Sequence, residues 1–369
     1  MLNKKVNKIS KKNRVLLVPL DWGLGHATRC IPLIKELQEL GCEVIVGAEK
    51  SVKSLLQHEF QQLIFIDLPG YRIRYSKTSY WLPLKIMVQI PGIIFNITRE
   101  HFWLKKVKKK FKIDAIISDN RFGLYLKATP TVYITHQLLI KTGSHFTEKI
   151  AQKIHYWFIK KYTYCWVPDF EEQPNLAGEL SCPKKLPGNT SFIGCLSRFE
   201  KQPLTIKKEG ILLLLSGPEP QRTIFENILL SQLNTYDGKI LFVRGLPGKD
   251  EKLPEPGCCD NVTIKNHLPA DQLNDAINAA EWVICRSGYT TIMDLVKLGQ
   301  KAILIPTPGQ TEQEYLADYL MKEKFFFAAK QDKFVLKDAI EMAGKFNFYI
   351  PSFNMNQYKK EVKLFVESI

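Results

Sequence analysis

The segment DWGLGHATR, residues 21–29, contains residue types that suit proton transfer beside a bound ligand. It follows the apolar run Val15–Leu20, so a strand is expected to end and a helix to begin here. Gly23 and Gly25 allow positive φ and close approach of a substrate. His26 would lie in the first helical turn, and an imidazole with a pKa of about 6.5 suits general-base work at neutral pH. We therefore take His26 as the first catalytic candidate; a capping or packing role is the alternative from position alone.

Two other residues are alternative candidates for the catalytic base. Asp119 follows an expected strand at 113–118, and His136 lies at the end of another at 131–135. Ligands of open parallel sheets gather at the carboxyl ends of the strands. Both side chains are therefore expected at the same sheet edge as His26.

The segment from Val283 to Leu320 brings polar residues to two neighbouring strand ends. The backbone N–H groups and hydroxyls of a helix start can hold a diphosphate, and a carboxylate one to two turns further can accept two ribose hydroxyls. The polar side chains at the second strand end could hold a sugar, and a solvated helix start is the alternative for Glu312 and Glu314 taken singly. The donor-binding candidates of this segment are Arg286, Ser287, Gly288, Thr290, Asp294, Gln310, Thr311 and Gln313.

A weaker candidate of the same kind is the turn at Ser216 and Gly217, which follows the apolar run 211–215. Its residues could hydrogen-bond a phosphate at the next helix start, with Arg222 close enough to contribute. A Ser-Gly-Pro turn is also common without any function. Gly25 completes the donor-binding candidates because it permits close approach of the donor.

The elements that would position these residues alternate between strands and helices along the whole chain. This alternation is typical of parallel strands joined by helical crossovers. Gly41 is expected to end the first helix as its C′ residue. The expected strands are 14–20, 43–48, 63–67, 113–118, 131–135, 164–168, 211–215, 239–243, 262–265, 281–285 and 302–306. The expected helices are 26–40, 51–58, 82–110, 146–160, 220–231, 270–279, 289–298, 311–323, 333–344 and 355–368.

A chain of 369 residues is too long for one ordinary core, and residues 171–210, rich in proline and glycine, interrupt the alternation. We interpret this break as the inter-domain region. The prediction is an N-terminal domain at 1–200, a C-terminal domain at 201–352, and a terminal helix at 353–369 that packs back on the N-terminal domain. The fold class is α/β, with two Rossmann-like domains whose parallel sheets face a central cleft.

The net charge of +15 favours an anionic partner: a nucleic acid, an anionic lipid or a phosphorylated substrate. Neither the lysine-rich first twelve residues nor the apolar stretch 82–97 has the pattern of a signal peptide or a membrane-spanning helix. The eight cysteines show no metal-binding spacing, and the adjacent pair Cys258-Cys259 is expected in a loop. We expect reduced thiols and a cytoplasmic protein, with peripheral attachment to the inner face of the cell membrane as an extension.

The expected attachment to the membrane depends on segment 71–112, which combines aromatic side chains with a lysine cluster. Such a combination suits a membrane interface with anionic lipids. A packed helix pair with a solvated lysine face is the alternative. The aromatic and basic residues are Tyr71, Arg72, Arg74, Tyr75, Tyr80, Trp81, Phe95, Phe102, Trp103, Lys105, Lys106, Lys108, Lys109, Lys110 and Lys112.

The stretch 283–320 resembles the donor-nucleotide motif of glycosyltransferase family 28, and DWGLGHATR and Thr135-His136-Gln137 resemble two further family features. The resemblance implies the GT-B fold and a nucleotide-diphospho-sugar donor, uridine-linked, held mainly by the C-terminal domain. Asp294 would take the place of the family's ribose-binding glutamate, and Gln313 would match the first residue of its glutamine pair. The chain departs from the family pattern at Asp294, Glu314 and Ala317, which bears on the identity of the donor sugar.

We therefore expect a glycosyltransferase that moves a sugar to an acceptor hydroxyl, lipid-linked or on a glycolipid, with inversion and without a metal or other cofactor. Asp-x-Asp, the motif that would demand a divalent ion, is absent from the sequence. A nucleotide-sugar 2-epimerase on the same fold is one alternative. A nucleic-acid-binding protein is another, although no nucleic-acid-reading motif appears and no nucleic-acid partner is expected. A fold that binds its sugar nucleotide without catalysis is the third.

Overall fold

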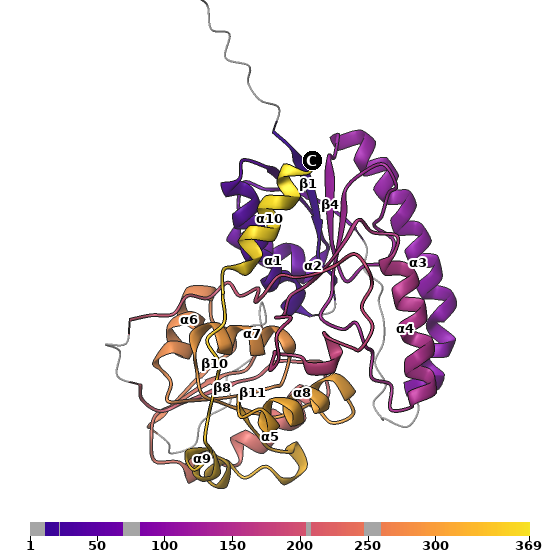
Figure 1. Ribbon diagram of the computed structural model, residues 1–369. Coiled ribbons are helices and arrows are strands. Elements are labelled where there is room, and N and C mark those ends of the chain that lie inside the picture. Colours follow the sequence, from indigo (N-terminus) through magenta and orange to yellow (C-terminus); the bar gives the residue numbers. More distant parts are fainter. Residues whose placement is uncertain (1–11, 22, 69–81, 204–207, 247–259) are drawn as a thin grey trace, which may run out of the picture.

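The computed structural model describes residues 12–21, 23–68, 82–203, 208–246 and 260–369, and for residues 82–91 it describes the backbone alone. It contains two parallel sheets, each flanked by helices, stacked one above the other in Figure 1. The predicted fold class is confirmed. Cys258-Cys259 and the aromatic and basic residues of 71–81 lie outside the described residues.

The N-terminal sheet is built from strands whose inward positions are apolar. All its neighbouring strands pair in parallel. Its order is β3 (Ile64–Ile66), β2 (Glu43–Gly47), β1 (Arg14–Val18), β4 (Ala115–Asp119), β5 (Thr131–Ile134), β6 (Tyr164–Val167), β7 (Thr190–Phe192). The order runs backwards to β1 and then jumps forward to β4, so the sheet has its topological switch point between β1 and β4.

The C-terminal sheet repeats this plan. Its strands also pair in parallel throughout. Its order is β10 (Val262–Lys265), β9 (Ile240–Val243), β8 (Ile211–Leu214), β11 (Trp282–Cys285), β12 (Ala302–Leu304), β13 (Phe327–Ala328). Here the switch point lies between β8 and β11.

The helices cover both faces of the two sheets (Figure 1). In the N-terminal half α1 and α2 pack together, while α3 and α4 lie on the opposite side of the sheet. Among the described residues, no helix is long and apolar enough to cross a membrane. The helices are α1 (Leu24–Glu39), α2 (Lys50–Glu59), α3 (Leu82–Phe111), α4 (His145–Ile159), α5 (Gln221–Leu230), α6 (Ala270–Ala279), α7 (Tyr289–Leu298), α8 (Thr311–Lys322), α9 (Leu336–Gly344) and α10 (Gln357–Glu367).

The expected elements agree closely with the observed ones, and Gly41, with a φ of 80°, follows the C-cap residue of α1 as predicted. The sequence pattern missed two short edge strands. β7 lies inside 171–210, which was expected to be only an inter-domain region, and β13 has two residues. Both strands are too short to show a period of their own. The chain crosses to the second sheet between residues 193 and 210, and the boundary at residue 200 stays a prediction.

The terminal helix α10 returns to the N-terminal half and packs on α1 (Figure 1). Val362 and Phe365 are buried there, and Phe365 meets the ring of Trp166 edge-on at 5.5 Å between ring centroids. One hydrophobic cluster extends from α1 through Tyr289 and Met293 of α7 into the C-terminal sheet. The two halves therefore share a continuous core.

Candidate active site

The two switch points explain why residues far apart in sequence meet. His26 lies in the first turn of α1, directly after β1, and Asp119 is the last residue of β4. Because β1 and β4 are neighbours and parallel, their carboxyl ends bring these side chains together across 93 residues of chain. In the C-terminal half, β8 and β11 likewise place the turn at Ser216 beside the start of α7.

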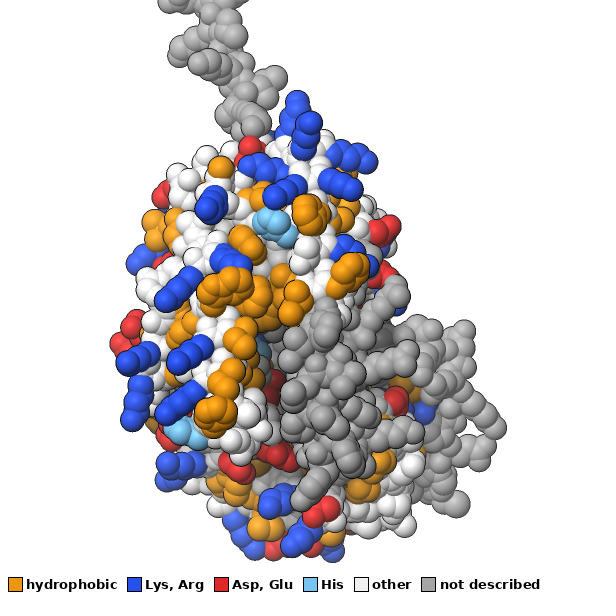
Figure 2. All heavy atoms as spheres, turned by 90° about the vertical axis from the view of Figure 1, so that its right-hand side faces the viewer, with side chains coloured by type: hydrophobic (Ala, Val, Ile, Leu, Met, Phe, Trp, Pro, Cys, Tyr) orange, Lys and Arg blue, Asp and Glu red, His pale blue; other side chains and the backbone are white. Residues whose placement is uncertain are grey.

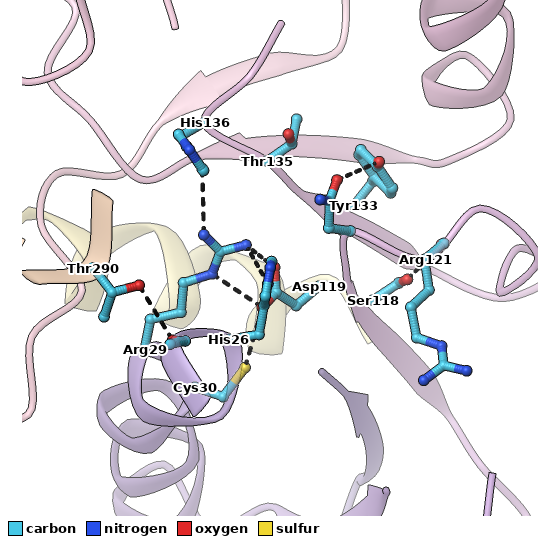
Figure 3. Close-up of polar contacts among 12 residues, drawn as sticks. His26, Arg29, Cys30, Ser118, Asp119, Arg121, Tyr133, Thr135, His136 and Thr290 are labelled. Atoms are coloured by element: carbon cyan, nitrogen blue, oxygen red, sulfur yellow. Dashed lines mark hydrogen bonds and ion pairs between the residues drawn. The ribbon is translucent and has the colours of Figure 1, made fainter. Parts of the chain in front are cut away.

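His26, Asp119 and Arg29 form a compact buried cluster (Figure 3). The His26 Nδ1 atom lies 2.9 Å from Oδ2 of Asp119, and Nε of Arg29 donates to the same oxygen at 3.0 Å. Nη2 of Arg29 also lies 2.9 Å from His26 Nδ1, but it has the second oxygen of Asp119 as its acceptor. A carboxylate can only accept, so the His26 proton belongs on Nδ1 and the lone pair on Nε2. This is the tautomer that a general base needs.

The electrostatics of the cluster favour a neutral imidazole. Burial lowers the pKa of His26, and the Arg29 charge lowers it further, against the opposing effect of Asp119. Burial alone would raise the pKa of Asp119, but Arg29 and His26 hold it at about 2. At neutral pH the site therefore pairs a neutral histidine with an ionised aspartate.

His136 extends this cluster to the C-terminal half. Arg29 Nη1 lies 3.3 Å from His136 Nδ1, and His136 Nε2 lies 2.7 Å from Oε1 of Glu312 at the start of α8. Because arginine can only donate, His136 accepts at Nδ1 and donates from Nε2 to Glu312. Hydrogen bonds thus link His26, Asp119, Arg29, His136 and Glu312 into one network, in which Asp119 accepts from both His26 and Arg29. Both ring nitrogens of His136 are engaged, which leaves it poorly placed to accept a substrate proton.

Glu312 is the residue that the sequence interpretation missed. Burial would raise its pKa, but His136 and the nearby His26 and Arg29 hold it below its usual value. The signal for this role is a contact across 176 positions of sequence, which no local pattern contains.

Two further contacts bind the start of α7 to the N-terminal half. The Thr290 hydroxyl donates to the carbonyl of Gly25 at 3.3 Å, and the Tyr289 hydroxyl donates to the carbonyl of Pro168 at 2.7 Å. The Tyr289 ring stacks on His136, with 4.0 Å between ring centroids. The first turns of α1 and α7 therefore face each other directly, as the two strand-end motifs were expected to do.

Asp294 lies half-buried in the second turn of α7. Its Oδ1 accepts a hydrogen bond of 2.5 Å from the Ser197 hydroxyl. Burial raises the pKa of Asp294 to about 7, since the opposing effects of Ser197 and Arg198 are smaller. Its second oxygen has no hydrogen bond among the described residues, so it can accept a ligand hydroxyl.

The start of α8 is ordered by its own polar side chains. The Gln313 carboxamide accepts from the backbone N–H of Thr307 at 2.9 Å and donates to the Gln310 side chain at 2.6 Å. The Ser287 hydroxyl donates to the carbonyl of Gln313, and the Thr311 hydroxyl donates to the carbonyl of Lys141 in the N-terminal half. These residues shape the turn that follows β12 and fix it against the other half.

Two of the expected donor-binding residues, Arg286 and Arg222, have their side chains turned inward. Arg286 is only 1% exposed, and its guanidinium donates to the carbonyls of Ile305, Pro306 and Gln221. Burial lowers its pKa to about 10. Arg286 therefore braces the loops behind the site instead of facing a diphosphate.

Arg222 is likewise turned inward, where it pairs with Glu226 at 2.8 Å and with Glu219 at 2.6 Å. Ser216 and Gly217 are exposed at the end of β8, and Gly217 has a φ of 104° that favours glycine. Gly288 is the half-buried N-cap of α7. Among the described residues, no three His, Cys, Asp or Glu side chains gather as a metal site requires.

Comparison with known proteins relates this chain to glycosyltransferases. The model of the glycosyltransferase family 28 C-terminal domain matches residues 230–342. An uncharacterized glycosyltransferase of Methanosarcina acetivorans is 23% identical over 334 residues, which cover 85% of this chain and 84% of that protein. The UDP-N-acetylglucosamine--N-acetylmuramyl-(pentapeptide) pyrophosphoryl-undecaprenol N-acetylglucosamine transferase of Francisella philomiragia is 25% identical, covering 90% of this chain and 88% of that protein.

Solved structures share the fold over almost the whole chain. The glycosyltransferase of kitacinnamycin has a TM-score of 0.62 at 14% identity, covering 97% of this chain and 96% of that one. MurG of Acinetobacter baumannii has a TM-score of 0.53 at 15% identity, covering 97% and 95%. The resemblance seen in the sequence is confirmed: this chain is a glycosyltransferase with the GT-B fold, and its residues 230–342 match the C-terminal domain of glycosyltransferase family 28.

Proposed function

We propose that the protein transfers a sugar from a UDP-sugar to the hydroxyl of a lipid-linked or glycolipid acceptor, with inversion and without a metal. The observation that carries this proposal is the orientation of His26. Asp119 engages its Nδ1, so its Nε2 lone pair is available at the point where the first turns of α1 and α7 meet.

The reaction follows from this arrangement. His26 Nε2 accepts the proton of the acceptor hydroxyl while the oxygen attacks the anomeric carbon of the donor. The bond between that carbon and the diphosphate oxygen breaks on the opposite face, so the anomeric centre inverts. Asp119 is ionised and stabilises the imidazolium that forms.

The donor would be held by the C-terminal half. Asp294 can accept hydroxyls of the ribose, and the unpaired N–H groups in the first turn of α7 point toward a diphosphate and stabilise its departure. The uridine base is supported by the relatives' names, which state a UDP-N-acetylglucosamine donor for those proteins. Asp119 is engaged by Arg29 and His26, so it is not available as a free carboxylate for epimerase chemistry.

His26→Ala tests the proposed base. General-base catalysis contributes about 10²–10⁴-fold, so turnover should fall by at least 100-fold. Affinity for the donor, measured by calorimetry, should stay within about threefold because His26 lies on the other half. The exposed His58 on α2 provides the control His58→Ala, with unchanged turnover. Normal turnover of His26→Ala would remove the assignment.

A panel of UDP-, GDP- and TDP-sugars in a thermal-shift assay tests the donor. Ligand binding to the folded state raises the melting temperature by mass action. We expect the largest shift with a UDP-sugar. A larger shift with a TDP-sugar would contradict the uridine assignment while leaving the site in place.

The acceptor's membrane origin is supported by an apolar ridge on α3 and α4. Figure 2 shows orange side chains along this face with lysines at its margin. Trp103, one of the expected interface residues, instead bonds to the carbonyl of Asp67 through its indole N–H and is half-buried. The exposed apolar residues of the ridge are Ile94, Phe95 and Phe102 on α3, and Phe146, Ile150, Ile154 and Trp157 on α4.

Phe102→Ser and Trp157→Ser together test this ridge, since both side chains are 58% exposed and can change without disturbing the core. Partition into vesicles of phosphatidylcholine and phosphatidylglycerol should fall at least tenfold, because apolar area is lost from the interface. Unchanged partition would count against membrane docking and in favour of a soluble acceptor.

A further inference from the structure

A separate pocket of about 770 Å³ lies on the outside of the N-terminal half, where α3 ends. Its walls come from the last turns of α3 and from the segment that leads into β5. The lining residues are His101, Lys105, Lys108, Lys109, Lys112, Tyr125, Leu126, Lys127, Ala128 and Thr129.

Most of the lysines of this pocket come from the end of α3. Positions 101, 105, 108 and 109 lie on neighbouring turns of one helical face, and Lys112 directly follows the last residue of α3. Lys127 adds a fifth lysine from the facing segment, and the lining contains no acidic side chain. Within the described part of the chain these five lysines form no ion pair, although Lys108 donates a hydrogen bond to the Thr129 hydroxyl. The cavity is therefore a concentration of positive charge without a counter-charge.

A tyrosine on the pocket wall connects the pocket to the apolar ridge. The Tyr125 hydroxyl accepts from Lys161 at 3.2 Å, and the Lys161 ammonium lies 3.3 Å from the centre of the Trp157 ring. Through Lys161 the pocket adjoins Trp157 of the apolar ridge, so a ligand could lie in both at once.

The pocket is not part of the reaction centre. It adjoins the start of β4 and β5, while Asp119 and His136 follow the ends of these strands. The pocket lies where these strands start, and His26 lies where they end. A group bound by the lysines is therefore separated from His26 by the length of the strands.

We propose that this pocket binds the phosphate groups of an anionic lipid headgroup, with the lipid chains lying along the apolar ridge. This deepens the membrane-docking part of the proposed function. The lysines supply the charge for a phosphomonoester or diphosphate, and the neighbouring Trp157 places the site at the depth of the headgroups. A free phosphate would use the same lysines without the ridge.

The experiment compares two pairs of substitutions on the full chain. Lys109→Gln with Lys127→Gln removes two pocket charges, and Lys106→Gln with Lys110→Gln removes two exposed charges that do not line the pocket. Binding is measured by co-sedimentation with phosphatidylcholine vesicles containing phosphatidic acid. Lys106 and Lys110 report the general attraction of a basic surface to an anionic membrane.

We expect the pocket pair to lose at least tenfold more affinity than the control pair. Equal losses would overturn the pocket while leaving membrane docking intact, and no binding by the unsubstituted protein would overturn both. Inorganic pyrophosphate provides the second arm. Tight calorimetric binding of pyrophosphate that depends on Lys109 and Lys127, without vesicle binding, would assign the pocket to a soluble phosphate and overturn the lipid. Binding of single-stranded RNA in place of vesicles would also overturn the proposed lipid ligand.

Discussion

The protonation state of His26 depends on neighbours supplied by three different elements. Arg29 on the same helix and burial both lower its pKa, and Asp119 from β4 opposes them without cancelling them. His136 from the end of β5 adds a smaller lowering effect. The base is therefore neutral and ready to accept a proton over a wider acidic range than an exposed histidine.

This leads to a prediction for the pH profile. A base must be unprotonated to act, so kcat at saturating donor and acceptor should stay level as the pH falls to 6.5 and should decline only below it. Initial rates at saturating substrates between pH 5 and 8, at fixed ionic strength, measure this without the pH dependence of donor binding. An acid limb at or above pH 6.5 would show that the pKa of the working base is not lowered, and would argue against His26 in this environment.

Asp294 gives a second prediction for a single residue, because its pKa is raised where that of His26 is lowered. Its pKa of about 7 means that it is mostly protonated at pH 6 and mostly ionised at pH 8. The ionised form accepts ribose hydroxyls more strongly. Affinity for UDP-N-acetylglucosamine, used as the probe, should therefore rise about tenfold from pH 6 to pH 8. Asp294→Asn should abolish this dependence, and an equal pH slope in both proteins would contradict the role of Asp294.

Some neighbours of His26 could be predicted from the sequence and others could not. Asp119 and His136 could be placed beside His26 because each follows an apolar run that becomes a parallel strand. Glu312 could not, since its partner His136 comes from the other sheet and the contact depends on how the halves dock. Arg286 follows a strand as expected, but whether a long side chain turns outward or inward depends on the carbonyls nearby, which no spacing reveals.

At the scale of elements, the first turns of α1 and α7 are held together at Gly25. A Cβ atom at residue 25 would lie 2.9 Å from the Thr290 hydroxyl oxygen, closer than unstrained contacts allow. Gly25 itself has no positive φ, unlike Gly23, whose φ is 79°. The requirement at residue 25 is thus the close approach of another helix, and Gly23 serves the turn.

Gly25→Ala should therefore push the two helix starts apart and lower kcat, with little change in the melting temperature. Thr290→Ala removes the obstructing oxygen, so the double variant should recover much of the lost activity even though the bond to the Gly25 carbonyl is gone. Kinetics of both single variants and the double variant give the coupling. Additive losses would show that the effect of residue 25 does not act through Thr290.

The strands β7 and β13 could not be predicted from the sequence pattern, in contrast to β8 and β11. β8 and β11 are apolar runs bounded by turns, so their pattern predicts them. β7 and β13 have three and two residues and are strands only because β6 and β12 offer hydrogen-bonding edges beside them. Their existence depends on tertiary pairing.

At the scale of the whole molecule, the chain connects its two halves twice. The first connection leads from β7 to β8, and the second leads from α9 to α10 and returns to the first half. Along this return the Phe353 ring stacks on Phe170, 4.2 Å apart between centroids, and Lys359 forms an ion pair with Glu36 of α1. The last helix thus belongs to the core of the first half although its sequence follows the second.

Phe365→Ala tests this connection. Phe365 is 3% exposed and packs against Trp166 of β6, so its loss leaves a cavity in the N-terminal half. Truncation of a buried phenylalanine costs about 3–5 kcal/mol, which should lower the melting temperature by roughly 6–15 °C. Leu364→Ala is the matched control, because Leu364 lies next to it on α10 and is 50% exposed. Its cost should stay within about 0.5 kcal/mol.

The two halves should respond differently to this loss. Calorimetric unfolding in the presence of a saturating UDP-sugar would stabilise the donor-binding half preferentially, so the unfolding of Phe365→Ala should separate into two transitions. The lower transition would report the N-terminal half without its terminal helix. A single transition shifted equally with and without the donor would show that the continuous core through Tyr289 and Met293 couples the halves more strongly than α10 does.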